Sequence, residues 1–229
     1  MTSPLQSIKK LLPSSLRDQY RFSYYNAINL VRWELKNLCG LHKYPKNSDN
    51  MLFVHLGCGS LELPGFINVD LRAHPHVHHR ANVDRLPFLK DGSIDLIYVS
   101  HCLEHISHRK IEKTLSEWRR VLKVGGILRI AVPDFDAVLS AYAKSQNDIK
   151  CIQGVLMGGQ DYAQNFHYTT FNETFLKSML ENGGFEDVRR WNPSNVGLGK
   201  ATDCSTAVLK VGETVIPVSL NLEAVKNGA

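Results

Sequence analysis

The chain has 229 residues, of which 43% are hydrophobic and 21% are charged, so we expect one globular domain with a well-formed core. No apolar run approaches the roughly 18 residues of a transmembrane helix, and we expect the protein in the cytoplasm. The five cysteines are widely spaced and form no C-x-x-C pair, which argues against a disulfide framework or a zinc site. The net charge of +5 belongs to residues 1–50, which contain eight Lys or Arg against three acids, so a nucleic-acid groove across the remaining chain is not expected.

Residues 1–50 are predicted to form a basic amphipathic helical extension. Apolar or aromatic residues recur at steps of three and four from Leu16 to Leu38, with Ser14 or Ser15 as the cap and Gly40 as the stop. This helix either packs on the following domain, as a lid over a ligand cleft, or lies on an anionic membrane surface through residues 14–38. A polar, turn-rich stretch at 44–50 marks the boundary, so a second unit is expected at 51–229.

The next stretch has the pattern of a nucleotide-binding turn. An apolar strand at 51–56 runs into Gly57-Cys58-Gly59-Ser60, and a second strand at 66–70 ends on Asp70. Glycine lets the backbone come close to a ligand with its N–H groups exposed. A carboxylate at the tip of the next strand can accept hydrogen bonds from a ribose diol. Together these features suggest a site for the adenosyl part of a cofactor.

Three histidines then recur at every second position, at 74, 76 and 78, which would place them on one face of a strand. No carboxylate or cysteine stands at a matching spacing, so we expect no metal there. The carboxylate of Asp84 follows, and it could accept a hydrogen bond from an exocyclic amine, with Leu86 and Phe88 beside the face of an adenine. The alternative is that Asp84 is only a turn residue before Pro87. The apolar run at 94–99 is typical of a buried parallel strand.

Two more polar groups are expected at the carboxyl edge of the sheet, where open α/β folds bind ligands. His101 and His105 stand four residues apart, on one face of a predicted helix. A further helix from Ser107 is expected to end at Gly125-Gly126 and to lead into a buried strand at 127–132, closed by Asp134.

The remaining chain continues the alternation of helices and strands. We expect a helix at 136–147, a glycine-rich loop over the site at 151–168, a helix at 172–181, a strand at 185–191, an irregular stretch at 192–202 and a last strand at 216–225. Strands that alternate with helices predict an α/β fold with a doubly wound sheet.

In this order the motifs resemble those of the class I S-adenosylmethionine-dependent methyltransferases, and most of all the type 11-like group with a shortened first motif. The resemblance covers residues 51–226 and rests on five segments: His55–Gly59, Pro64–Asp70, Leu86–Asp95, Ser100–His105 and Trp118–Asp134. It implies a Rossmann-like sheet of about seven strands, mostly parallel with the last strand antiparallel. A nicotinamide enzyme is disfavoured because Asp70 follows Gly59 by eleven residues and a third glycine is missing; a Walker A loop is excluded because its Lys-Ser/Thr is missing.

The resemblance also implies the roles of particular residues. S-adenosylmethionine would be held by these groups: Leu56, Gly57, Cys58 and Gly59 at the methionine, Asp70 and Leu71 at the ribose, Asp84, Arg85 and Leu86 at the adenine, and Ser100 and His101 beside the sulfonium. In place of the usual first helix only residues 57–65 join the two strands, so that helix would be a turn or two at most.

Methyl transfer to an oxygen also needs a group that takes the acceptor's proton, and histidine has a pKa suited to that task. His105 is the first candidate for this base and His167 the second. Asp134 would orient the base or bind a hydroxyl group of the acceptor. Glu104 is expected to form a salt bridge with Arg109 or His108. The acceptor would be a small molecule or a sugar hydroxyl of a glycan or glycoconjugate. The alternatives are a catalytically silent cofactor-fold module and a peripheral membrane protein.

Overall fold

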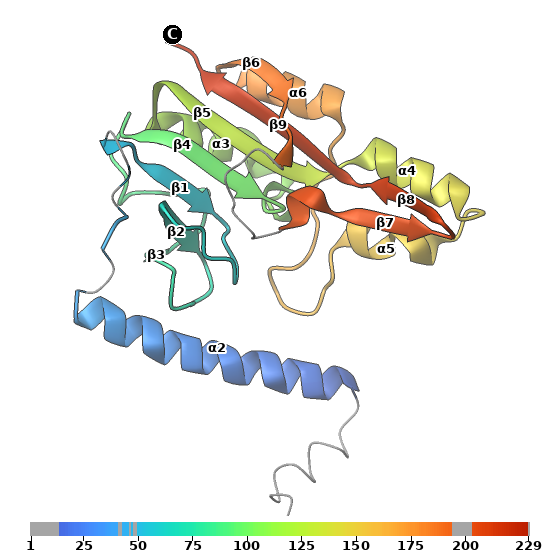
Figure 1. The fold of residues 1–229 in the computed structure, drawn as a ribbon, viewed down its shortest axis with the longest axis horizontal. Helices are drawn as coiled ribbons and strands as arrows, with labels where there is room; N and C mark the ends of the chain where they lie inside the picture. The colour runs from blue at the N-terminus through green and yellow to red at the C-terminus, as the bar shows by residue number, and fades with distance from the viewer. Residues whose placement is uncertain (1–13, 41–42, 46, 48–49, 194–202, 229) are drawn as a thin grey trace, which may run out of the picture.

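The structure is a computed structural model that describes residues 14–40, 43–45, 47, 50–193 and 203–228, with side chains from residue 23 onward (Figure 1). Most of the stretch expected to be irregular, 192–202, lies outside the described residues. None of the described helices is long and apolar enough to cross a membrane.

Seven strands form a single sheet in the order β3-β2-β1-β4-β5-β9-β6 (Figure 1). The pairs from β3 to β5 are parallel, and β9 runs antiparallel to both β5 and β6. The expected mostly parallel Rossmann-like sheet, with its last strand antiparallel, is therefore confirmed. In chain order the strands are β1 (Phe53–Leu56), β2 (Phe66–Asp70), β3 (His79–Arg80), β4 (Ile94–Ser100), β5 (Leu122–Pro133), β6 (Phe185–Arg190) and β9 (Ser219–Lys226).

The largest core lies between this sheet and two helices, α3 (Ile111–Val121) and α6 (Glu173–Asn182). Each helix turns one apolar stripe towards the strands, with Trp118 of α3 and Leu176 of α6 fully buried. Beside the sheet, to the right in Figure 1, a smaller core joins four further elements: α4 (Phe135–Lys144), α5 (Ile149–Met157), β7 (Val208–Val211) and β8 (Thr214–Pro217).

Two expected boundaries are wrong because strand pairing decides them. The helix that begins near Ser107 ends at Val121, and β5 already pairs with β4 from Leu122, so Gly125 and Gly126 lie inside the strand region. The strand expected at 216–225 is two strands. At Val218 the chain leaves the β7–β8 hairpin for the sheet, with its N–H bonded to Ala207 and its carbonyl accepting from Asp134.

Two expectations about the segments near the site are also wrong. Residues 101–105 form no α-helix, because His101 has a positive φ of 47° and only the short 3-10 turn η2 (Leu103–His105) follows. The first part of the loop expected at 151–168 is helix α5, which Asp148 caps by accepting from the N–H of Lys150. Gly158 ends that helix with a φ of 80°.

Residues 57–65 join β1 to β2 without any helix. The N–H groups of Gly57 and Cys58 donate to the carbonyl of Val69, at 2.9 and 3.2 Å. These bonds fold the turn directly onto the end of β2. The connection is therefore shorter still than the turn or two of helix that the sequence allowed.

The extension is a 25-residue helix, α2 (Ser14–Leu38), as expected. It contacts the segment around β3 through its polar side: the indole of Trp33 donates to Val77 at 2.8 Å and Lys36 donates to Pro75 at 2.8 Å. Of the expected apolar stripe, Tyr24, Val31, Leu35 and Leu38 are exposed to solvent, and the side chains before residue 23 lie outside the described part. The helix therefore docks, but by a different face from the one the periodicity indicated.

Candidate functional site

The glycine turn after β1 and the acid at the end of β2 are held together by backbone hydrogen bonds. One carboxylate oxygen of Asp70 accepts from the N–H of Gly59 and the other from the N–H of Arg72, both at 2.7 Å. Gly57 and Gly59 have φ values of 65° and 54°, which favour glycine. Each carboxylate oxygen has a second lone pair, so Asp70 is fixed in place and can still accept from a ligand.

A cavity of about 370 Å³ opens beside this turn. Four predicted cofactor residues line it: Gly57, Asp70, Leu71 and His101. A Cβ on Gly57 would lie 2.5 Å from Sγ of Cys102, so a side chain at this position would displace Cys102, which also lines the cavity. The volume falls in the range of small-molecule pockets. An acceptor-only carboxylate next to a bare backbone edge fits the ribose diol and the methionine end of S-adenosylmethionine.

A second cavity of about 340 Å³ adjoins the first and shares five lining residues with it: Asn82, Val83, His105, Ile106 and Tyr168. Asp84 lines only this second cavity. Asn82 and Val83, which the sequence reasoning missed, come just after β3 at the carboxyl end of the sheet. Their place after a strand could have indicated a ligand site, but β3 has only two residues, too few to be recognised as a strand from the sequence.

The remaining predicted cofactor residues do not line either cavity. Three are buried beneath the site: Leu56, Cys58 and Leu86. Burial raises the pKa of the Cys58 thiol, so it stays protonated and inert. Three others lie around the site: Gly59, which bonds to Asp70, Arg85, which is exposed, and Ser100, at the end of β4.

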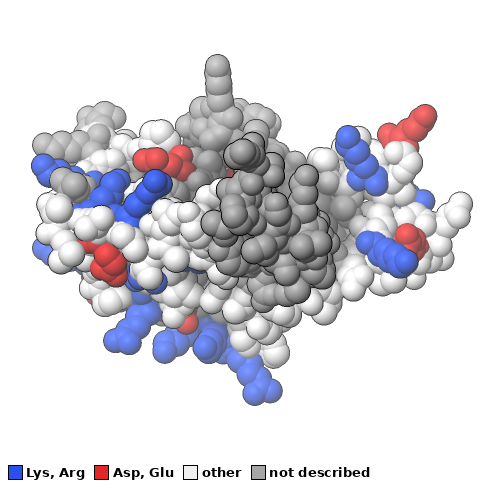
Figure 2. All heavy atoms as spheres, turned by 90° about the horizontal axis from the view of Figure 1, so that it is seen from below, with Lys and Arg blue, Asp and Glu red and all other residues white. Residues whose placement is uncertain are grey.

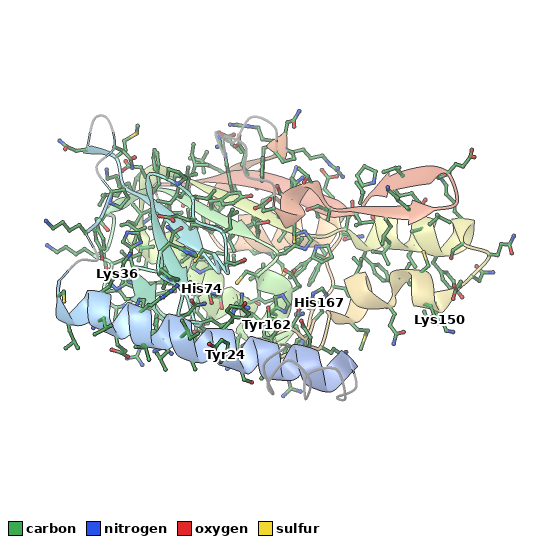
Figure 3. The ribbon with its side chains drawn as sticks, turned by 60° about the horizontal axis from the view of Figure 1, so that its bottom comes forward. Tyr24, Lys36, His74, Lys150, Tyr162 and His167 are labelled. Carbon is green, nitrogen blue, oxygen red and sulfur yellow. The ribbon has the colours of Figure 1, made fainter. Side chains whose placement is uncertain are left out.

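The loop after α5 covers part of the larger cavity through Tyr162, Ala163 and Gln164. The guanidinium of Arg72 lies over the ring of Tyr162, 4.7 Å from its centre. A cation–π contact of this kind ties the loop to the end of β2. Figure 3 shows Tyr162 on the side of the domain that faces α2, with His74 and His167 on either side of it. No described residue of α2 lines the cavity, so the covering part is this loop.

A buried carboxylate stands behind the wall that His101 and His105 form. Glu104, at the centre of η2, has a side chain that is 1% exposed. Three imidazole nitrogens surround its Oε1: Nδ1 of His101 at 3.4 Å, Nε2 of His105 at 4.0 Å and Nε2 of His167 at 3.9 Å. The expectation that Glu104 pairs with Arg109 or His108 is wrong, because its side chain points inward.

His167 reaches this cluster through pairing between two distant segments. The N–H groups of Tyr168 and Thr169 donate to the carbonyl of Glu104, at 2.8 and 3.3 Å. The rings of His105 and His167 meet edge to face, 4.8 Å between centres. The two histidines that the sequence ranked as possible bases are therefore neighbours.

The charges in the cluster depend on one another. Burial acts to raise the pKa of Glu104, but the neighbouring imidazole of His101, and after it that of His105, hold this pKa below its ordinary value. Burial lowers the pKa of His167, against the attraction of Glu104. Glu104 is thus a buried anion and His167 tends to be neutral.

The other predicted polar residues are not brought into this cluster. Asp134 caps α4, accepting from the N–H of Asp136 at 3.1 Å, and lines neither of the two large cavities. The histidines at 74, 76 and 78 contact three different groups: the amide of Asn29, the thiol of Cys58 and the N–H of Asn68. They do not converge as a ligand set.

Comparisons with known proteins agree with this fold. The family model described as a methyltransferase domain matches residues 64–130, which include Asp70 and the segment from 81 to 105 that lines both cavities. The chain is 30% identical over 125 residues to the ubiquinone/menaquinone biosynthesis C-methyltransferase UbiE of Haemophilus ducreyi, covering 50% of this chain and 46% of that protein. It is 33% identical over 121 residues to UbiE of Cronobacter sakazakii, covering 49% and 47%. The chain thus spans about half the length of the curated relatives it matches.

Solved structures share the fold at low sequence identity. A chain from the complex between the Haloferax volcanii Trm112 methyltransferase activator and a methyltransferase is 14% identical, with a TM-score of 0.52, over 91% of this chain and 96% of that one. The Burkholderia thailandensis 1,6-didemethyltoxoflavin-N1-methyltransferase, solved with S-adenosylhomocysteine, is also 14% identical, with a TM-score of 0.50, over 99% and 92%. These structures show the fold, and the matched domain model shows that residues 64–130, which include Asp70, are similar to a methyltransferase domain.

Proposed function

We propose that the chain transfers a methyl group from S-adenosylmethionine to a hydroxyl group, carried by a small molecule or by a glycan or glycoconjugate. One observation carries the proposal. Gly57 and Asp70, which fit the cofactor, and the imidazoles of His101 and His105 line the same cavity. The groups that would bind the cofactor and the groups that would contact an acceptor therefore face one continuous space.

Bound S-adenosylmethionine supplies an electrophilic methyl group. The chain has to align the acceptor with that methyl group and keep water away. Asp70 would hold the ribose, the Gly57 turn would hold the methionine end, and Asn82 would lie beside the adenine. The loop at Tyr162, which covers part of the cavity, would limit the access of water to the cofactor and the acceptor.

An oxygen acceptor must also lose a proton. His105 lines both cavities and is the group best placed to contact the hydroxyl and take its proton. The ring of His167 meets that of His105 edge to face and would act through it. Asp134 lines neither of these two cavities, so we give it no part in the proton transfer. The names of the relatives support methyl transfer in general but specify carbon and nitrogen acceptors. The choice of oxygen rests on the imidazoles.

Calorimetry with S-adenosylmethionine and S-adenosylhomocysteine tests the cofactor site. Asp70→Asn should weaken binding about tenfold or more, since a hydrogen bond to a charged group contributes roughly 1.5–3 kcal/mol. Asp136→Asn is the matched control, because Asp136 is exposed on α4 and lines neither of the two large cavities, and it should bind within about threefold of the wild type. A wild-type chain that binds neither compound would instead be a silent cofactor-fold module.

Transfer of a labelled methyl group tests the acceptor. We expect label in sugar or phenol hydroxyls, and a loss of transfer in His105→Gln with cofactor affinity retained. Label found only in amine or carbon acceptors would contradict the oxygen proposal and leave the cofactor site standing.

A further inference from the structure

Glu104 is a charged group with no hydrogen-bond partner for either of its buried carboxylate oxygens among the described residues. A buried carboxylate without hydrogen bonds or a counter-charge is costly, and native proteins supply a partner. The nearest polar atoms are imidazole nitrogens, and two of them, on His105 and His167, lie 3.9–4.0 Å away, beyond hydrogen-bond distance.

The tautomers of His105 and His167 follow from the contacts of their Nδ1 atoms. Nδ1 of His105 lies 3.1 Å from the carbonyl oxygen of Phe166, and Nδ1 of His167 lies 2.9 Å from that of Val155. A carbonyl oxygen only accepts, so each Nδ1 must carry the hydrogen. In the neutral ring, Nε2 then presents a lone pair. Two lone pairs and a carboxylate then face one another across a small space. This arrangement is repulsive unless a metal ion lies between them or one of the imidazoles takes up a second proton.

The arrangement matches the way proteins prepare histidine for a metal. A ligating imidazole almost always donates its other N–H to a carbonyl or carboxylate, which fixes the tautomer and the ring orientation. One possible ligand atom from each of Glu104, His105 and His167 lies within 4.8 Å of the other two. Ligand atoms around an ion with bonds of about 2.0–2.1 Å are roughly 3.3 Å apart, so a small contraction would close the site.

His101 has a different role from the other two histidines. Its Nε2 lies 3.0 Å from the hydroxyl of Ser219, which can either donate or accept, so this contact leaves the tautomer open. Its Nδ1 lies 3.4 Å from Oε1 of Glu104, beside the carboxylate but without the geometry of a hydrogen bond. We therefore leave His101 outside the ligand set.

We propose that Glu104, His105 and His167 bind a divalent transition-metal ion of the Zn²⁺ type. Two imidazoles and one carboxylate suit Zn²⁺, Fe²⁺, Co²⁺ or Ni²⁺ better than Mg²⁺ or Ca²⁺, which prefer oxygen ligands. Three protein ligands leave a coordination position open, as in catalytic rather than structural sites. His105 also lines the cavity, so the ion would lie at its inner wall.

Ion binding does not depend on the proposed methyl transfer. A role of the ion in methyl transfer would rest on the proposed function. In that case His105 would be a metal ligand and could not also act as the free base. The ion would instead lower the pKa of the acceptor hydroxyl. For this reason the test measures binding first and transfer only afterwards.

The experiment titrates Zn²⁺ alone into the full chain after treatment with a chelator, using calorimetry and metal analysis. Co²⁺ is added in parallel, and its visible absorption reports the ligand geometry. We expect one ion per chain. Glu104→Gln and His167→Gln should each weaken binding about 100-fold or more, because loss of even an outer-shell partner costs 10–100-fold. Circular dichroism and thermal melts check that each variant is folded.

The matched control is His74→Gln combined with His76→Gln, which removes two histidines from the segment most able to bind metal adventitiously. Those rings are stacked 5.6 Å apart and lie outside the cluster. The control should keep the ion. The proposal is overturned if the wild type binds no ion at micromolar concentration, or if the control loses it while Glu104→Gln retains it. The first outcome can be read without any variant, and neither outcome bears on whether S-adenosylmethionine binds.

Discussion

At the scale of single residues, Gly57 lets Cys102 pack directly against the turn at the wall of the cavity. Its φ of 65° is one that L side chains rarely adopt, and the space where a Cβ would stand is taken by Cys102. Cys102 itself is held against the turn by the short segment between β4 and η2. The conformation and the close approach both require glycine, for independent reasons.

We predict that Gly57→Ala weakens binding of S-adenosylhomocysteine at least about tenfold, because the added methyl group displaces Cys102 in the wall of the cavity, while backbone strain of roughly 1–2 kcal/mol lowers stability. Calorimetry gives the affinity. Gly92→Ala is the matched control: Gly92 has a φ of 57° but nothing within 4 Å of the added Cβ. It should lose a similar amount of stability and keep its affinity. Equal affinities for the two variants would contradict a special role for Gly57.

At the scale of elements, the site depends on two segments that lie over the domain: the loop after α5 and the helix α2. The loop is anchored at both ends, since Gly158 caps α5 and His167 donates its N–H to Met157. Between these anchors, the contact between Tyr162 and Arg72 holds it over the cavity.

Replacing the ring of Tyr162 should release this loop. We predict that Tyr162→Ala raises the dissociation constant of S-adenosylhomocysteine by about three- to tenfold, since a cation–π contact at such a site contributes roughly 0.5–1 kcal/mol and the ring also covers the cavity. Tyr162→Phe keeps the ring and should stay close to the wild type. Hydrogen exchange at 159–166 should rise in the alanine variant alone; unchanged exchange there would show that the contact does not hold the loop.

The second segment, α2, presents an apolar stripe to solvent. Val31 and Leu35 are 59% and 57% exposed. Figure 2, which views this side of the molecule, shows more Lys and Arg than Asp and Glu on its left and lower parts. An exposed apolar stripe with basic neighbours is typical of helices that lie on anionic membranes. We therefore keep weak membrane-surface contact as a proposal for α2.

Flotation with vesicles that contain phosphatidylserine tests this contact. We predict that the full chain floats with them at low salt and that Leu35→Glu reduces the bound fraction several-fold, because it places a charge in the apolar stripe. Asn37→Glu makes the same change in charge on an exposed position outside the stripe and should bind nearly as well as the wild type. If both variants lose binding equally, net charge alone explains it. If the wild type stays unbound, the proposal fails.

At the scale of the whole molecule, the sheet buries a histidine that couples folding to pH. His55 of β1 is 2% exposed, lies 5.3 Å from the ring of Tyr98 between centres, and its Nδ1 has no partner among the described residues. Burial lowers its pKa to about 4 from 6.5. Because the unfolded chain binds the proton more tightly, stability is full above about pH 6.5 and falls until the pH reaches about 4.

The contribution of His55 between pH 7.5 and 5 should be about 2 kcal/mol. We predict that the difference in unfolding free energy between the wild type and His55→Asn shrinks by about this amount over that range, as measured by urea denaturation. His108→Asn changes an exposed histidine and should show no such trend. A constant difference for His55→Asn would mean that the pKa of His55 is the same in the folded and the unfolded chain.

Most of the sheet and the cofactor side of the site could be predicted from the sequence, because they depend on local patterns. Apolar runs marked β1, β2 and β4, a glycine turn marked the close approach, and an acid at a strand tip marked Asp70. Boundaries failed where a distant partner decided them. Leu122 joins β5 because β4 lies beside it, and β9 begins where the chain leaves the hairpin at Val218.

The sequence by itself determined the α/β alternation, the position of the Gly57 turn and the acid that follows it, since each is set by residues adjacent in the chain. Only the tertiary structure decided that Asn82 lines the cavity, that α2 docks by its polar side, and that Glu104 faces three histidines. His167 joins that cluster because the chain at Tyr168 pairs with Glu104, more than sixty residues earlier. Contacts between residues so far apart in the sequence depend on how the helices and strands pack, and the spacing of neighbouring residues does not predict them.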